Sequence, residues 1–290
     1  MKSYSGTGLK MHIPPVVLGT ETYSGNWGIN YTSQEVSEIL DYALENGIKE
    51  IDTASSYGDN HQVESLLGSA MLGQRKDFVI ASKFHSNHSG INKGVPIKSV
   101  SELENDFAET LKALKTDYLD IYYFHSGSDD LFFQDEIWNF LNGLVKAGSI
   151  TSLGLSLNHA LVKSGSNKQL LAAKDYGISV VQTVLNIISN EALQFVVPYC
   201  KTEGLTLYGR MPLAKGLLSG KYNTSSVFAE NDPRGKDSKM TTQILHNLQS
   251  EEKNININYA IKWALEHASK VVVGTKNTEQ LDGVIRASIQ

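Results

Sequence analysis

Cysteine is nearly absent from this 290-residue sequence, and because Cys200 is the only one, an intrachain disulfide is excluded. A single cysteine also fits a reducing compartment. No stretch approaches the roughly 20 apolar residues of a membrane span, and the start, MKSYSGTGLKMHIPP, lacks the apolar core of a secretory signal. We therefore expect a cytoplasmic protein without a membrane partner. With a net charge of −5 and no long basic run, nucleic acid is not expected as the main partner.

Hydrolytic signatures are missing too, since the sequence has no H-E-x-x-H, no G-x-S-x-G and no close set of cysteines. Zinc-dependent and serine-dependent hydrolysis therefore have no support, and we expect no metal. What the sequence does have is 41% hydrophobic and 20% charged residues, typical of a globular protein with a sizeable core. The absence of a repeat, a low-complexity tract or a Pro/Gly-rich linker favours one domain over residues 1–290.

Short β-branched runs alternate with segments of helical period, as expected for βα units around a parallel sheet. Strands are predicted at 16–20, 49–54, 78–83, 118–125, 149–156, 179–186, 205–211 and 270–275. Eight such units predict a (β/α)8 TIM barrel of the α/β class, with a doubly wound open sheet as the alternative. After the seventh strand, the long loop 221–253 exceeds an ordinary βα connection, so we expect it to be functional or mobile.

Helix boundaries are readable at two places. Ser33 is expected to cap the first helix, and Gly47 to end it in a left-handed conformation. Ser99 and Glu102 match a capping box ahead of the third helix.

Polar residues stand where the predicted strands end. They are Thr20, Asp52, Lys83, His125, Ser156, Gln182, Asn186, Arg210 and Thr275. In a barrel the carboxyl ends of all strands share one face, so these side chains would converge there, whereas an open sheet would spread many of them apart.

Asp52, Tyr57, Lys83 and His125 together suit acid catalysis on a carbonyl. A phenol with a pKa of about 10 is a weak acid, and a nearby ammonium such as Lys83 lowers that pKa. Asp52 would keep a buried Lys83 charged, and His125 can orient or polarise a substrate oxygen. Each residue alone also has an ordinary structural interpretation, but their placement at successive strand ends favours the joint one. An aldolase-like barrel with Lys83 as a Schiff-base lysine stays open, although it requires a neutral Lys83.

Six motifs, in order, resemble those of the aldo-keto reductase family, and the similarity extends over nearly the whole chain. They are IDTASSYG, IASK, YYFH, VQTVLN, RMPLAKGLLSGKY and VVVGTKNTEQL. The resemblance implies a (β/α)8 barrel that binds NADPH without a Rossmann fold and reduces aldehydes or ketones, sometimes in reverse. It implies Tyr57 as the general acid, Asp52 and Lys83 as its tuning pair, and His125 as the residue that orients the carbonyl.

The same resemblance implies a set of cofactor contacts. Thr275 and Lys276 would meet the 2′-phosphate, which favours NADPH over NADH, and Gln280 would meet the adenine. Backbone amides along the pyrophosphate are implied around Leu213, Gly216, Leu218 and Gly220. The remaining cofactor contacts are implied for Thr20, Ser156, Asn158, Gln182 and Arg210, with Gln182 and Ser156 at the nicotinamide carboxamide.

Three positions depart from the family pattern. Leu157 takes the place of an asparagine, with Asn158 displaced by one, and Val284 replaces an adenine-side asparagine. Arg210 stands where many members have a stacking tyrosine, so it could contact the cofactor or an anionic substrate. Because the last helix is followed directly by Gln290, we expect no extended C-terminal loop, and a pocket that is open or completed by another subunit. The sequence indicates no oligomeric state.

Two functions fit these features. The first is an NADPH-dependent reductase of a small aldehyde or ketone of sugar-like polarity, which would contact Tyr23, Trp27 and Phe84 in loops 21–32 and 84–98. The second is an NADPH-binding regulatory or scaffold barrel with little turnover. Leu157 and Arg210 leave the second open, whereas the complete Asp-Tyr-Lys-His set favours the first.

Overall fold

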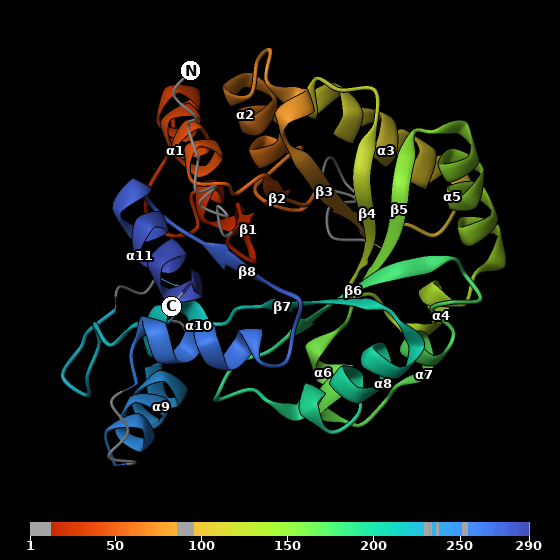
Figure 1. Ribbon diagram of the computed structural model, residues 1–290. Helices are drawn as coiled ribbons and strands as arrows, with labels where there is room; N and C mark the ends of the chain where they lie inside the picture. Colours follow the sequence, from red (N-terminus) through yellow and green to blue (C-terminus); the bar gives the residue numbers. More distant parts are fainter. Residues whose placement is uncertain are drawn as a thin grey trace, which may run out of the picture.

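The computed structural model describes residues 13–85, 96–228, 232, 234–235, 238–250 and 255–289. Its parallel strands close into a barrel in chain order, with β1 paired to β8 (Figure 1). The strands are β1 (Val16–Gly19), β2 (Glu50–Asp52), β3 (Val79–Phe84), β4 (Leu119–His125), β5 (Ile150–Ser156), β6 (Ile178–Val184), β7 (Thr206–Arg210) and β8 (Lys270–Gly274). All eight predicted strands are confirmed, and the pairing of β1 with β8 excludes the open sheet.

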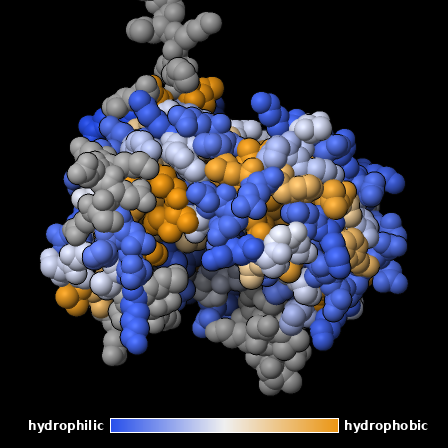
Figure 2. Space-filling view, turned by 90° about the horizontal axis from the view of Figure 1, so that it is seen from below, coloured by the Kyte–Doolittle hydropathy of each residue, from blue (hydrophilic) through white to orange (hydrophobic). Residues whose placement is uncertain are grey.

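Helices surround the barrel, and α11 lies between α1 and α10, where it covers the junction of the first and last strands (Figure 1). The helices are α1 (Ser33–Glu45), α2 (Gln62–Ala70), α3 (Val100–Leu114), α4 (Asp129–Phe132), α5 (Asp135–Ala147), α6 (His159–Lys163), α7 (Lys168–Leu171), α8 (Val196–Glu203), α9 (Ser238–Ser250), α10 (Ile257–Leu265) and α11 (Thr278–Ile289). None of the helices in the described segments combines the length and apolar character needed to cross a membrane. On the face in Figure 2, apolar residues form separate patches among polar side chains.

The observed helix ends agree in part with the ends predicted from the sequence. The cap of α1 is Thr32 rather than Ser33, because Thr32 and Glu35 exchange the two hydrogen bonds of a capping box. Gly47 follows α1 with a φ of 80°, as predicted. Ser99 caps α3 by accepting from the backbone of Glu102.

The long segment after β7 contains a helix that was not predicted. This helix, α9, buries Thr241 and Leu245, which are one turn apart. Parts of the predicted loops 84–98 and 221–253 lie outside the described residues.

Inward-facing side chains alternate along every strand and fill the barrel interior. Its apolar layer consists of Val17, Ala81, Ile121, Tyr123, Val180, Tyr208 and Val272. Two residues further along β3, β4 and β7, the same inward face carries Lys83, His125 and Arg210. The alternation therefore places the polar strand ends directly above the core.

Candidate active site

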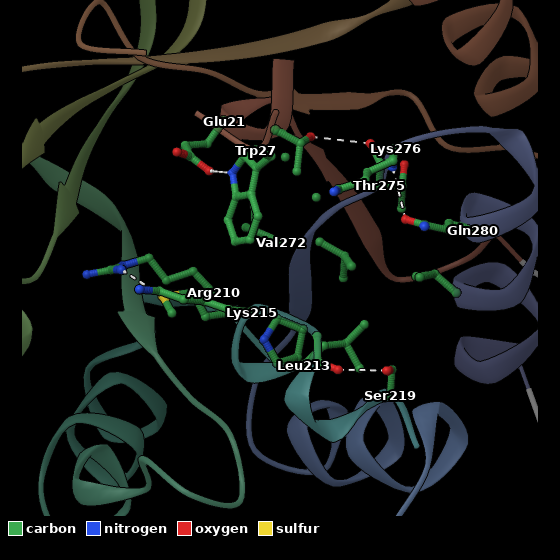
Figure 3. A pocket seen from close by; sticks show the side chains of 18 of the residues that line it. Glu21, Trp27, Arg210, Leu213, Lys215, Ser219, Val272, Thr275, Lys276 and Gln280 are labelled. Carbon is green, nitrogen blue, oxygen red and sulfur yellow. Dashed lines mark hydrogen bonds between the residues drawn. The ribbon is translucent and has the colours of Figure 1, made fainter. Parts of the chain in front are cut away.

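A cavity of about 700 Å³ opens at the carboxyl ends of the strands. This volume falls in the range of small-molecule and cofactor sites. The residues singled out in the sequence that line it are Thr20, Trp27, Asp52, Tyr57, His125, Gln182, Arg210, Leu213, Gly216, Thr275, Lys276, Gln280 and Val284, several of which appear in Figure 3.

Lys83 joins Asp52 and Tyr57 into one chain of hydrogen bonds. Its side chain is fully buried, and Nζ donates to Asp52 Oδ1 at 2.5 Å and to the Thr53 carbonyl at 2.7 Å. Nζ also donates to the Tyr57 hydroxyl oxygen at 3.3 Å. Since the phenol oxygen accepts from Lys83, the Tyr57 hydrogen remains available to the cavity.

The protonation states of Lys83 and Tyr57 depend on their burial and on the neighbouring charges. Burial lowers the pKa of Lys83, but the Asp52 carboxylate and the Tyr57 hydroxyl outweigh it, so the pKa lies above its ordinary value. Lys83 is therefore charged, which does not favour the Schiff-base alternative. For Tyr57, burial raises the pKa above 10 although the Lys83 charge lowers it. The expectation of a lowered Tyr57 pKa is wrong, because the effect of burial is larger than that of Lys83. Tyr57 therefore holds its proton at neutral pH.

Gln182 binds the carboxylate oxygen of Asp52 that Lys83 does not contact. Its Nε2 donates to Asp52 Oδ2 at 2.8 Å, and its Oε1 accepts from Ser156 Oγ at 3.4 Å. Both carboxylate oxygens of Asp52 are thus bonded, one by Lys83 and one by Gln182.

His125 completes the group beside Tyr57. The two rings lie 6.1 Å apart between centroids at an interplanar angle of 81°, and His125 Nδ1 is 3.5 Å from Ser56 Oγ. An imidazole and a phenol therefore face the same part of the cavity, where a carbonyl oxygen could contact both.

Several predicted contacts are not on the cavity wall. Tyr23 and Phe84 are each 1% exposed and pack in the core, so the expectation that they touch the substrate is wrong. Phe84 follows inward-facing Lys83 on β3 and so points outward. Tyr23 packs edge-on against Tyr31.

Four expected cofactor residues also lie off the wall: Ser156, Asn158, Leu218 and Gly220. Ser156 is buried behind Gln182, and Asn158 caps α6 by accepting from the backbone of Ala160. Leu218 is buried in the turn segment Ala214–Ser219, which is kinked at Lys215 and Gly216, both in the left-handed region.

This segment and the residues just after it bring to the cavity two cations that the sequence did not single out, Lys215 and Lys221. Lys215 and Lys221 line the wall with Gly216, whose φ of 88° suits a residue without a side chain. Lys276 lies across the cavity, where Tyr31 donates to its carbonyl at 2.9 Å and Gln280 accepts from its backbone amide at 3.1 Å. Lysines at both edges are a donor set that fits the phosphates of a dinucleotide.

Arg234, which the sequence analysis also missed, lines the cavity as a buried side chain. Its guanidinium is bonded to Asp232 at 2.6 Å and sits over the rings of Trp27, Tyr222 and Phe228 at 5.7, 4.8 and 4.4 Å. The Trp27 indole donates to Glu21 Oε2 at 2.5 Å, which orients the ring. The segment after β7 thus contacts the loop after β1 across the cavity.

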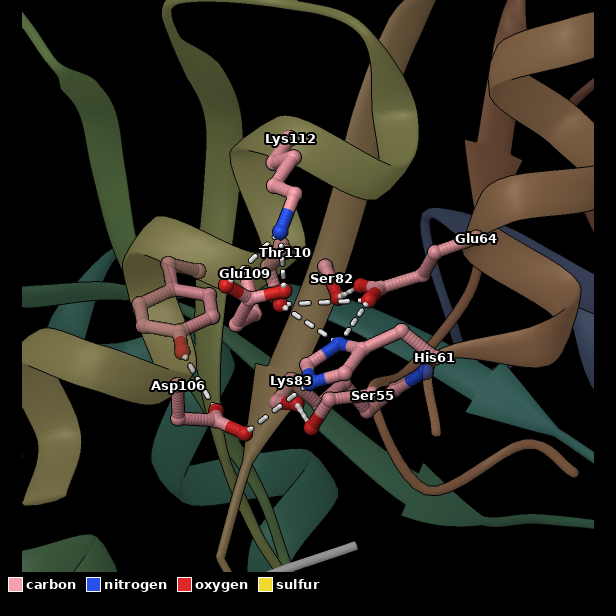
Figure 4. A network of polar contacts seen from close by, with 10 residues as sticks. Ser55, His61, Glu64, Ser82, Lys83, Asp106, Glu109, Thr110 and Lys112 are labelled. Atoms are coloured by element: carbon pink, nitrogen blue, oxygen red, sulfur yellow. Dashed lines mark hydrogen bonds and ion pairs between the residues drawn. The ribbon is translucent and has the colours of Figure 1, made fainter. Parts of the chain in front are cut away.

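A buried polar network lies behind β3, between α2 and α3 (Figure 4). Glu64 accepts from Ser82 at 2.5 Å and from Thr110 at 3.2 Å, and lies 2.6 Å from His61 Nδ1. Nε2 of His61 is 3.7 Å from Asp106 Oδ1. This cluster supports β3 from the outside. Among the described residues, no group of His, Cys, Asp and Glu side chains is arranged to hold a metal ion.

A closed parallel barrel with its polar groups at the carboxyl ends defines a (β/α)8 protein whose site lies at that mouth. The model described as the Aldo/keto reductase family matches residues 15–290, and the chain therefore belongs to this family. The resemblance inferred from the motifs is confirmed.

Two Bacillus subtilis proteins are similar in sequence. An uncharacterized oxidoreductase, YrpG, is 28% identical over 97% of this chain and 88% of its own length, and the aldo-keto reductase YhdN is 28% identical over 92% and 82%.

Solved structures share the fold. A glycerol dehydrogenase from Gluconobacter oxydans superposes with a TM-score of 0.76 at 22% identity, covering 97% of this chain and 88% of that one. The holo form of an aldo-keto reductase from Bacillus halodurans gives a TM-score of 0.76 at 21% identity, covering 96% and 88%. Family membership supports an oxidoreductase that acts on carbonyl compounds with a nicotinamide cofactor.

Proposed function

We propose that this protein is an NADPH-dependent reductase that converts an aldehyde or ketone to an alcohol, with Tyr57 as the proton donor. The observation that carries this proposal is the Tyr57 hydroxyl at the cavity wall, bonded at 3.3 Å to a buried Lys83 that is itself paired with Asp52. Trp27, on the cavity wall, is the remaining candidate for substrate contact.

Bound NADPH supplies the hydride that adds to the carbonyl carbon. As negative charge develops on the carbonyl oxygen, the Tyr57 O–H donates its proton and becomes a phenolate, because an alkoxide is a much stronger base. Lys83, fixed as an ammonium by Asp52, stabilises that phenolate until it takes a proton from solvent. His125 faces the same part of the cavity and holds the carbonyl oxygen toward Tyr57.

The cofactor assignment depends on the cations at the edges of the cavity. Lys276 is our candidate for the 2′-phosphate, with Lys215 and Lys221 along the diphosphate. A charged hydrogen bond to a phosphate is worth about 1.5–3 kcal/mol. Lys276→Met is therefore expected to weaken NADPH binding about tenfold or more and leave NADH binding nearly unchanged.

A regulatory barrel with little turnover is the alternative, and one experiment separates the two. Nucleotide binding is measured by fluorescence titration, and turnover by NADPH absorbance with a panel of aldehydes and ketones, for wild type, Tyr57→Phe and Tyr123→Phe. Tyr123 is a matched control because its buried hydroxyl has no hydrogen-bond partner among the described residues. We expect Tyr57→Phe to bind NADPH without turnover and Tyr123→Phe to retain turnover. Binding without turnover in wild type would favour the regulatory role, and no nucleotide binding would refute both.

A further inference from the structure

Arg210 places a guanidinium in the catalytic part of the cavity. It is the last residue of β7, faces inward, and lines the wall with Tyr57 and His125. One terminal nitrogen, Nη2, donates to the carbonyl of Leu157 at 3.3 Å, which draws the side chain across β6 toward the end of β5. The guanidinium is close enough to Tyr57 and Asp52 for their charges to interact with it.

Among the described residues, no acidic group lies within ion-pair distance of Arg210, and the charge of Asp52 acts on it only from further away. Its other contacts are Met211 Sδ at 3.7 Å from Nη1 and the Leu157 carbonyl, while Nε is buried without a hydrogen-bond partner among the described residues. Asp52, whose charge acts on Arg210, already has both oxygens bonded by Lys83 and Gln182. A half-buried guanidinium whose donors are incompletely paired favours the binding of an anion.

The charges that line the cavity also favour an anionic ligand. Although the protein carries a net charge of −5, six cationic and only three acidic side chains line the cavity. Lys215, Lys221 and Lys276 are available to cofactor phosphates, and Arg210 lies on the opposite side from Thr275, Lys276 and Gln280 (Figure 3). The phosphate end of the cavity thus has its own cations, and Arg210 is left for another anion.

We propose that the substrate is an aldehyde or ketone that carries a carboxylate, and that Arg210 binds this carboxylate beside Tyr57. A guanidinium and a carboxylate pair through two parallel hydrogen bonds, which fixes orientation as well as affinity. Arg210 is then a specificity-determining residue, and the inference rests on the proposed reductase function.

The test compares two substrates that differ in one charge, 4-formylbenzoate and its methyl ester, with wild type, Arg210→Met and Arg210→Lys. For wild type, kcat/KM is expected to be at least about tenfold higher for the acid. Arg210→Met should lose this preference through a higher KM for the acid only, and Arg210→Lys should keep part of it. The dissociation constant for NADPH should change less than about twofold. A melting curve of each variant confirms that it is folded.

Three results would overturn the inference: equal kcat/KM for acid and ester in wild type, equal loss on both substrates in Arg210→Met, or weakened NADPH binding in that variant. If neither aldehyde is turned over, titration of the protein–NADP⁺ complex with benzoate and benzamide tests whether Arg210 forms an anion site. Benzoate binding that Arg210→Met abolishes would uphold the anion site while the reductase proposal fails. The anion site would be refuted if wild type does not bind benzoate, or if wild type and Arg210→Met bind it equally.

Discussion

Gln182 donates a hydrogen bond to Asp52 at 2.8 Å, although 130 positions separate the two residues in the chain. This bond holds the second oxygen of the carboxylate that keeps Lys83 charged. Gln182→Leu keeps the volume but leaves that oxygen unpaired inside the barrel, and a hydrogen bond to a charged group is worth about 1.5–3 kcal/mol. We expect turnover to fall about tenfold or more, measured as kcat. Ser156→Ala is the control, because its 3.4 Å contact to Gln182 is long, and it should lose less than about threefold. Equal losses in the two variants would contradict the role of Gln182.

Lys83→Met tests the buried ion pair. Removing one partner leaves the Asp52 carboxylate buried without its cation, which typically costs about 3–5 kcal/mol of unfolding free energy. Adding Asp52→Asn removes the stranded charge, so the double variant should recover a large part of that loss while remaining inactive. Urea denaturation measures the unfolding free energies of the single and the double variant. A double variant less stable than Lys83→Met would show that the pair does not act as a unit.

Stability should fall as the pH rises through neutrality, because of the network behind β3. Burial raises the pKa of Asp106 to about 7, so the stability that its proton confers is complete below about pH 4 and lost as the pH rises through 7. Burial lowers the pKa of His61, but Glu64 and Asp106 outweigh it and the net pKa is raised, so its contribution is complete below 6.5 and also lost at higher pH.

The unfolding free energy should therefore decrease from pH 5 to 8, by at most about 1.4 kcal/mol per pH unit for each proton. Asp106→Asn should flatten this slope in denaturation curves, whereas Asp41→Asn on α1 should leave it unchanged. An unaltered slope in Asp106→Asn would refute the assignment.

Gly154 makes room for a ring inside the barrel. A Cβ at this position would overlap the side chain of Tyr123, which packs beneath Lys83. Gly154→Ala should therefore cost about 1–3 kcal/mol of unfolding free energy, as expected for overpacking. Gly143, within α5, is the matched control because an added Cβ meets nothing within 4 Å there. Gly143→Ala should be neutral or stabilising by up to about 1 kcal/mol, since alanine is the better helix former. Equal effects would be inconsistent with this packing.

The strands, their order and the polar residues at their ends were predictable, because each depends on local pattern. Period-two alternation, applied from Lys83, would also have placed Phe84 outside the barrel. The bond between Gln182 and Asp52 and the lack of an acidic partner for Arg210 were not predictable, since both depend on which side chains meet after closure. Arg234 was missed because its role depends on aromatic rings from two separate loops.

The spacing of the site along the chain also bears on how the molecule is assembled. Asp52 stands on the second strand and Gln182 on the sixth, while Lys276 follows the eighth, so no contiguous half of the chain carries the whole cavity. The cavity is finished only when β8 pairs with β1. That same event removes the two exposed edges through which a partly folded sheet could pair with another chain. A ligand that binds the cavity would thus select molecules that have already passed the step most exposed to aggregation.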